Sequence, residues 1–158
     1  MQKLPHRYVV VAAGDMLDDI ELAADSLPLL KSAPPTEFDG PGDRWSPETL
    51  LVGAVAACYV LTFRAVARAS RVTWTWLRCD VSGTLEKVDQ ALQFTDFEVR
   101  ARLSIPPTMD AAQARRALEK AERQCLISNS LKGTMHLTIA IDIDDVVIQA
   151  EAAAVPRS

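Results

Sequence analysis

Alternation of hydrophobic and polar residues marks three strands in the second half of the chain. In residues 73–85 one face carries Thr73, Thr75, Leu77, Cys79, Val81 and Leu85, and residues 97–105 and 134–143 also alternate apolar with polar side chains. Such alternation is typical of strands with one buried and one solvated face. The first two segments are joined by a polar connection, so we expect an antiparallel hairpin, with 134–143 as the last strand.

The first quarter of the chain predicts a further hairpin and a loop. Residues 8–12 and 20–23 favour β structure and flank the turn residues Gly14 and Asp15. Residues 33–47 contain four prolines and two glycines, a composition typical of a loop.

Two segments have helical character. The first, about 47–70, starts with Ser46 as a cap and Pro47 in the first helical position. Its residues 50–61 are apolar or small all round, which predicts burial on every side and a partner chain as the simplest cover. The second, 110–126, has one apolar stripe and an opposite face of alternating charge.

Composition narrows the class of protein. The 158 residues are 49% hydrophobic and 24% charged, which predicts one globular domain over 1–158 with a flexible tail from about 150. A net charge of −4 argues against nucleic acid or an anionic membrane as a partner. The N-terminus lacks the pattern of a signal peptide, and the apolar run 50–60 is too short to span a bilayer. We therefore expect a cytoplasmic protein.

Three cysteines, Cys58, Cys79 and Cys125, carry the candidate chemistry. No CxxC pair is present and the chain has only two histidines, so no zinc site is expected. Cys79 lies on the apolar face of a predicted strand, where a cysteine is a core residue. Cys58 and Cys125 lie on the two predicted helices, which leaves two possibilities. Each cysteine only packs in the core, or the helices bring the two sulfurs within disulfide reach.

Two motifs resemble those of the OsmC/Ohr family. The sequence SPETLL at 46–51, with Cys58 ten residues after Glu48, looks like the PE-x-L…C signature. The sequence AERQCLISNS at 121–130 is similar to the second motif, usually C-P-x-S, with Leu126 in place of the proline. The resemblance covers nearly the whole chain. It implies an α+β fold, with antiparallel sheets wrapped around two central helices in an intertwined homodimer.

The activity that this resemblance implies is a cysteine-based hydroperoxide reductase, a thiol-dependent peroxidase. By position, Cys58 would be the thiol that attacks an organic hydroperoxide, and Cys125 the thiol that converts the sulfenic acid into a disulfide. The resemblance implies no metal and no bound cofactor. An external dithiol, a lipoyl group or a small thiol, would reduce the disulfide.

Two further residues are candidates for the same site. The family places an arginine near the thiolate; here the first turn is acidic, and Arg44 is the only arginine in the loop before Glu48. Glu48 is either an active-site residue or a first-turn carboxylate that favours the helix dipole. Cys58 lies mid-helix, where burial should raise its pKa. Glu48 and Cys58 would be ~15 Å apart along one helix, so a shared role would require two subunits.

Two other functions remain open. One is a catalytically impaired OsmC-like dimer that binds a small apolar ligand, and the other is a redox sensor that works through a disulfide. Trp74 and Trp76 could cover a partner surface or line a substrate pocket, and we favour the partner surface. Ser128 and Asn129 are expected only to end the second helix.

Overall fold

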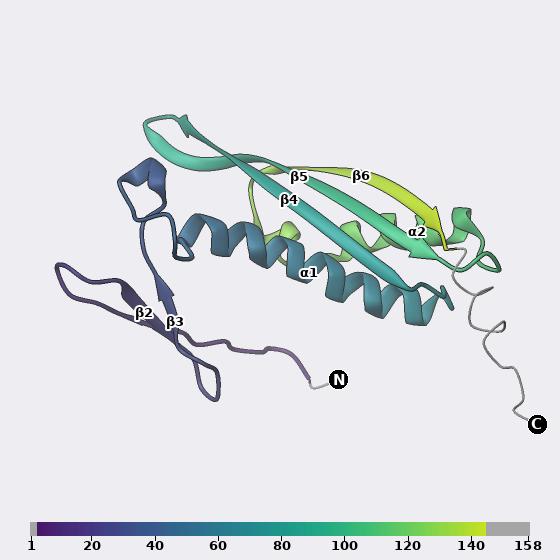
Figure 1. Cartoon of the computed structure of the whole chain (residues 1–158), viewed down its shortest axis with the longest axis horizontal. Coiled ribbons are helices and arrows are strands. Elements are labelled where there is room, and N and C mark those ends of the chain that lie inside the picture. The colour runs from purple at the N-terminus through teal and green to yellow at the C-terminus, as the bar shows by residue number, and fades with distance from the viewer. Residues whose placement is uncertain (1–2, 145–158) are drawn as a thin grey trace, which may run out of the picture. The chain divides into compact units, whose positions relative to one another are not determined.

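The computed structural model describes residues 3–144 and divides into two compact units, Met1–Leu51 and Val52–Ser158. Each unit is described by itself (Figure 1). That residues 1–158 form a single domain stays a prediction. The predicted tail from about 150 lies outside the described residues.

The first unit contains a small antiparallel sheet of three strands in the order β1-β2-β3. The strands are β1 (Val11–Ala13), β2 (Ile20–Ala23) and β3 (Leu30–Ser32). The first two form the predicted hairpin. The sequence did not predict β3, because three residues are too few to show alternation. The loop that follows contains a 3₁₀ turn, η1 (Thr36–Phe38), and returns to the sheet where Ala33 N donates to Trp45 O at 3.1 Å.

The long helix α1 (Pro47–Ala69) begins where the sequence predicted. The backbone N–H of Thr49 donates to Ser46 Oγ at 3.1 Å, and Ser46 N–H donates to Thr49 Oγ1 at 2.8 Å, which satisfies two otherwise unpaired donors. By length and composition α1 could cross a membrane, a property that core helices of soluble proteins share. The apolar run 50–60, which the sequence showed to be too short to span a bilayer, is therefore shorter than the helix that meets this criterion.

One face of α1 is buried within the chain and another is not. The buried residues include Tyr59 and Phe63, whereas Leu61 is 58% exposed. A single chain therefore leaves part of this helix exposed, and its burial on every side by a partner chain stays a prediction.

The second unit is built on a three-stranded sheet in the order β4-β5-β6. Its strands are β4 (Trp76–Val88), β5 (Ala91–Ile105) and β6 (Thr134–Ile143). β4 and β5 form the predicted antiparallel hairpin, but they are longer than the alternation indicated and meet at a turn of two residues. Asp89 and Gln90 adopt φ values of 47° and 70° there, a left-handed conformation that polar residues tolerate in tight hairpin turns.

The last strand corrects the predicted sheet. β6 lies parallel to β5, with Asp96 opposite Thr134 and Ile105 opposite Ile143, so the sheet is mixed and not antiparallel throughout. Between them the chain forms α2 (Ala111–Gln124) and the 3₁₀ turn η2 (Ser128–Ser130). A parallel neighbour needs such a crossover, and alternation alone carries no information about strand direction.

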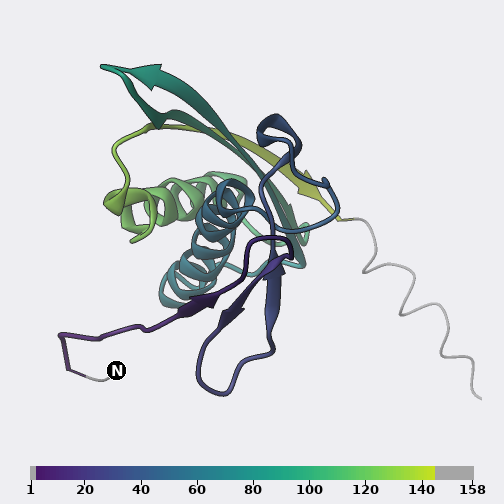
Figure 2. The same cartoon turned by 90° about the vertical axis from the view of Figure 1, so that its left-hand side faces the viewer.

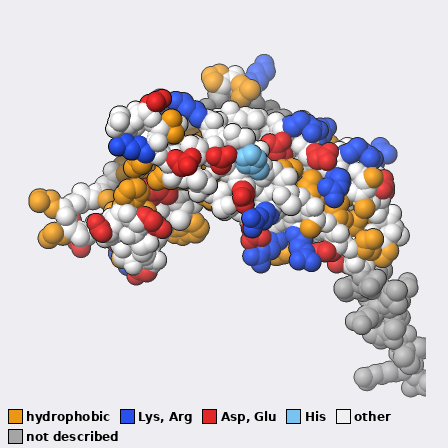
Figure 3. Space-filling model, turned by 90° about the horizontal axis from the view of Figure 1, so that it is seen from above, with side chains coloured by type: hydrophobic (Ala, Val, Ile, Leu, Met, Phe, Trp, Pro, Cys, Tyr) orange, Lys and Arg blue, Asp and Glu red, His pale blue; other side chains and the backbone are white. Residues whose placement is uncertain are grey.

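Both helices of this unit lie against the same face of the sheet (Figures 1 and 2). Tyr59 of α1 donates its hydroxyl hydrogen to the carbonyl oxygen of Leu118 in α2 at 3.3 Å. Trp74 is half-buried and meets Phe63 edge-on, with ring centroids 5.5 Å apart; that it covers a partner surface stays a prediction. Trp76 is 67% exposed. The opposite face of the sheet is charged (Figure 3), with ion pairs such as Arg78–Asp80 and Arg102–Asp142.

Candidate functional site

Cys58 and Cys125 lie next to each other in the second unit. Cys58 is half-buried in the middle of α1, and Cys125 is fully buried directly after α2. The helix predicted to reach residue 126 ends at Gln124, so Cys125 takes an extended backbone conformation at the helix end. Both cysteines are free thiols, and they lie close enough to influence each other's ionisation: the interaction lowers the pKa of Cys58 and raises that of Cys125.

Hydrogen bonds lower the pKa of Cys58. Burial is the largest single influence and acts to raise that pKa, as the sequence predicted. It is outweighed by the backbone N–H of Ile127, the Cys125 thiol, the Thr62 hydroxyl and the backbone N–H of Leu126, all of which stabilise the thiolate. The Thr62 oxygen lies 3.9 Å from the Cys58 sulfur. The expectation that burial would leave Cys58 with a raised pKa is therefore wrong.

The pKa of Cys125 moves in the opposite direction. Burial raises it most, the neighbouring Cys58 adds to that increase, and hydrogen bonds from the side chain and backbone of Ser128 oppose it. Cys58 therefore ionises before Cys125. The contact with Ser128, which is 9% exposed, gives this residue a role beyond ending the helix. The sequence signal for this role was the position of Ser128, three residues after Cys125.

Cys79 lies in β4 and is half-buried. Burial raises the pKa of its thiol to about 11, with smaller contributions from Asp80 and Cys125. A thiol with this pKa is almost entirely protonated at neutral pH, and a protonated thiol is a poor nucleophile.

The other two candidates, Arg44 and Glu48, belong to the first unit. Arg44 Nε donates to Asp19 Oδ2 at 2.7 Å, and its NH1 group pairs with Asp43 at 2.9 Å. Asp19 is the main cause of a raised Arg44 pKa. Glu48 lies in the first turn of α1, and its Oε2 is buried without a hydrogen-bond partner. No hydrogen bond or ion pair joins Arg44 to Glu48 within residues 3–144.

The described residues contain no group of three or more His, Cys, Asp and Glu side chains arranged to hold a metal ion. The groups that act on Cys58 within residues 52–144 are a thiol, a hydroxyl and two backbone amides. These are hydrogen-bond donors, and this arrangement is suited to stabilising a thiolate without a cation.

Comparison with known proteins identifies the family. Residues 40–140, more than half of the chain, match the family described as OsmC-like protein. The chain belongs to the OsmC-like family. This OsmC-like protein is also 30% identical over 114 residues to the uncharacterized protein YmaD of Bacillus subtilis, a match that spans 69% of this chain and 75% of that protein.

Solved structures show the same fold. An OsmC-like protein of unknown function from Vibrio cholerae superimposes with a TM-score of 0.79 at 16% identity, over 85% of this OsmC-like chain and 99% of its own. An organic hydroperoxide resistance protein OsmC from Legionella pneumophila gives 0.69 at 21% identity, over 89% and 99%. OhrB of Bacillus subtilis, an organic hydroperoxide resistance protein, gives 0.64 at 16% identity, over 87% and 98%. The α+β OsmC/Ohr fold that the sequence predicted is confirmed.

Proposed function

We propose that this protein is a thiol-dependent peroxidase that reduces organic hydroperoxides through Cys58 and Cys125. The observation that carries the proposal is the contact between two free thiols whose pKa values are shifted in opposite directions. A two-cysteine peroxidase needs one thiol that is readily ionised to attack the peroxide and a second thiol close enough to capture the sulfenic acid. Solved structures of the same fold include proteins named for organic hydroperoxide resistance, which supports this substrate class.

In the first step the Cys58 thiolate attacks the terminal oxygen of the hydroperoxide. An S–O bond forms, the O–O bond breaks, and the alkoxide takes a proton and leaves as the alcohol. Cys58 becomes a sulfenic acid, so the sulfur is oxidised by two electrons and the peroxide is reduced by two. The donors around the Cys58 sulfur favour this step because they keep it ionised.

In the second step the Cys125 sulfur attacks the sulfenic sulfur of Cys58. An S–S bond forms, the S–O bond breaks, and the oxygen leaves as water with the Cys125 proton. Because the two thiols already lie in contact, little movement is required. An external dithiol then reduces the disulfide by thiol–disulfide exchange and becomes oxidised itself. We propose that a lipoyl group or a small dithiol carries out this reduction and that no bound cofactor takes part in the cycle.

The functional form we propose is a cytoplasmic homodimer. The exposed face of α1, which includes Leu61 at 58% exposure, supports a partner chain as its cover. A reducing compartment would keep the three cysteines available as thiols. Glu48 would act on the thiol of the other subunit. That Arg44 supplies a cation near the Cys58 thiolate stays a prediction. If it does, Arg44→Ala should raise the pH at which Cys58 is alkylated.

Peroxide consumption tests the proposal. Cumene hydroperoxide is supplied with dithiothreitol or dihydrolipoamide, and its loss is followed for the wild type and three matched Cys→Ser variants. Cys58→Ser should abolish turnover. Cys125→Ser should stop the cycle at a sulfenic acid that dimedone traps, and Cys79→Ser should leave turnover unchanged.

Peptide mapping after one equivalent of peroxide supplies an independent check. It should find a disulfide between Cys58 and Cys125. A disulfide that includes Cys79, or turnover that survives Cys58→Ser, would overturn the assignment.

A further inference from the structure

The solvent-facing side of α2 is a basic surface. Its exposed cations, together called the α2 patch, are Arg115, Arg116, Lys120 and Arg123. Lys120 lies one helical turn from both Arg116 and Arg123, and Arg115 flanks Arg116, so the four side chains share one face. The other face of α2 is apolar and buried in the core of the second unit.

Most of the α2 patch has no counter-charge of its own. Within residues 3–144, Arg116 pairs with Asp110 at 3.9 Å, whereas Arg115, Lys120 and Arg123 form no ion pair. The arginines on the outer face of the sheet (Figure 3) differ, because each of them pairs with a nearby carboxylate: Arg78 with Asp80, Arg100 with Glu98 and Arg102 with Asp142. The sheet face is therefore balanced in charge, and the α2 patch is not.

The stability of the helix does not account for this pattern. Like charges four residues apart repel each other, as Arg116 and Lys120 do. The helix dipole favours a cation only near the C-terminal end, so it explains Arg123 but not Arg115 and Arg116 in the first half of α2. An anionic partner bound to this face would offset the repulsion.

The basic surface extends beyond α2 at one end and reaches the thiol pair at the other. The side-chain amide of Gln113 donates to the carbonyl oxygen of Ser70 at 2.8 Å, which places the end of α1 beside the start of α2. Arg68 and Arg71, on either side of Ser70, are exposed and form no ion pair within residues 3–144. Cys125 follows directly after α2, so a partner bound along this helix would lie next to the thiol site.

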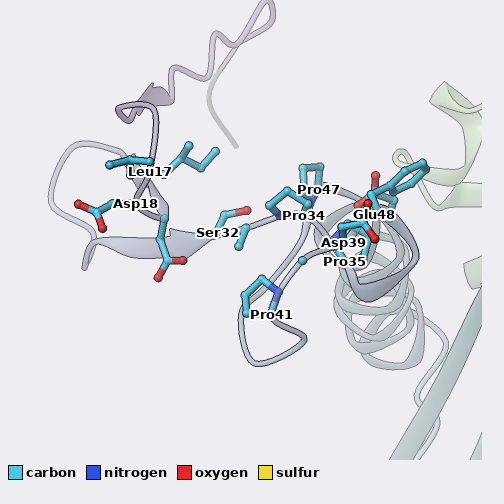
Figure 4. A pocket seen from close by; sticks show the side chains of 14 residues that line it. Leu17, Asp18, Ser32, Pro34, Pro35, Asp39, Pro41, Pro47 and Glu48 are labelled. Carbon is cyan, nitrogen blue, oxygen red and sulfur yellow. The ribbon is translucent and has the colours of Figure 1, made fainter.

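The basic character is local and is not a property of the whole chain. The protein has a net charge of −4. The first unit, residues 1–51, contains nine carboxylates and four lysines and arginines, a net charge of −5. Three of these carboxylates, Asp18, Asp39 and Glu48, line a cavity of that unit (Figure 4). An anionic partner would therefore be repelled by the first unit and attracted to the α2 patch.

We propose that the α2 patch is a docking surface for a folded protein with an acidic surface. Glu119 and Glu122 lie half-buried among the cations and would repel a uniformly charged phosphate backbone, whereas a protein surface carries charges of both signs. A membrane fits less well because the apolar face of α2 is already buried in the core and has no part left to enter a bilayer. The proposal uses only charge and exposure and does not rest on peroxidase activity.

A titration with three probes tests the proposal. The ¹⁵N-labelled full chain is mixed at low salt with a peptide of six alternating Glu and Ala pairs, the same peptide with Lys in place of Glu, or a thymidine heptanucleotide with six phosphates. The Glu peptide should shift amides of residues 112–124, and its affinity should fall as salt is added. The Lys peptide should cause no shifts there. The heptanucleotide should bind at least about threefold more weakly than the Glu peptide.

Charge-reversed variants locate the contact. Arg115→Glu with Lys120→Glu should weaken binding of the Glu peptide by at least about tenfold, whereas Arg78→Glu with Arg100→Glu, on the balanced sheet face, should not. Lys120→Gln should cause a smaller loss and serves if the double reversal folds poorly. Tighter binding of the heptanucleotide or of phosphatidylserine vesicles, or an equal loss in both reversed pairs, would overturn the proposal. A change of oligomeric state in the α2 variant would also overturn it, because the face would then be a contact between copies of this chain.

Discussion

The Cys125 thiol at the end of α2 lies beside the Cys58 sulfur in the middle of α1, and this proximity lowers the pKa of Cys58 and raises that of Cys125. The interaction favours the thiolate on Cys58 and the proton on Cys125, so each thiol helps to set the state of the other. The division of roles proposed for the two sulfurs follows from this asymmetry. It depends on short-range hydrogen bonds, and it should therefore change little with ionic strength.

The pH dependence of alkylation should separate the three cysteines. The pKa of Cys58 is lowered, so its thiolate fraction, and with it the rate of reaction with iodoacetamide, should reach half of its maximum at a lower pH than for an ordinary cysteine. Cys79, with a pKa of about 11, should react appreciably only in strong alkali. Mass spectrometry of peptides alkylated at a series of pH values gives each profile. A Cys58 midpoint at or above that of free cysteine would contradict this picture.

Residue 126 offers a test of the backbone donors. The N–H of Leu126 helps to lower the pKa of Cys58, and a proline has no N–H to donate. Leu126→Pro should therefore raise the pH midpoint of Cys58 alkylation, whereas Leu126→Ala, which keeps the N–H, should leave it unchanged. Circular dichroism would confirm that both variants are folded. If the two variants share one midpoint, the Leu126 amide does not stabilise the thiolate.

Two apolar residues of α1 should differ in their effect on stability. Phe63 is fully buried and packs against Trp74, so Phe63→Ala should lower the free energy of unfolding by about 3–5 kcal/mol. Leu61 is 58% exposed within one chain, so Leu61→Ala should cost far less in a monomer. Urea unfolding at a protein concentration well below the dimer dissociation constant compares the stabilities of the two variants. A large loss for Leu61→Ala that appears only at high protein concentration would place this residue at the dimer interface.

A mixed dimer tests whether two chains share each active site. Glu48→Gln chains and Cys58→Ser chains should each be inactive alone. After joint refolding, half of the dimers should be mixed, and each mixed dimer should regain one of its two sites. Activity should therefore recover to about a quarter of the wild-type value under random pairing. Sites built within one chain would give no recovery, and sedimentation as a stable monomer would argue equally against sharing.

The sequence predicted those elements whose signal is local. The alternation over 134–143 gave the exact bounds of β6, and Ser46 with Pro47 gave the start of α1. It could not predict that β6 runs parallel to β5, because alternation is the same in both directions. It also missed β3, whose three residues are too few to form a pattern.

In the candidate site, too, the sequence predicted which residues matter but not how their atoms are arranged. Two motifs were enough to select Cys58 and Cys125, which the structure places in contact. The donors from Leu126 and Ile127 were missed because every residue except proline has a backbone N–H, and only the fold determines where it points. Leu126 in place of proline was noticed in the sequence, but its consequence for Cys58 became visible only in three dimensions.

The parallel pairing of β5 and β6 also sets an order of events during folding. The β4–β5 hairpin joins residues that are close in the chain, whereas β6 can pair with β5 only after the intervening α2 segment has crossed the sheet. Pairings with long sequence separation are slow to form, so we expect β6 to dock last. Cys125 lies on that crossover and should reach Cys58 only then. The reactive pair would thus be assembled at the end of folding, and partly folded chains emerging from the ribosome would not yet consume peroxide.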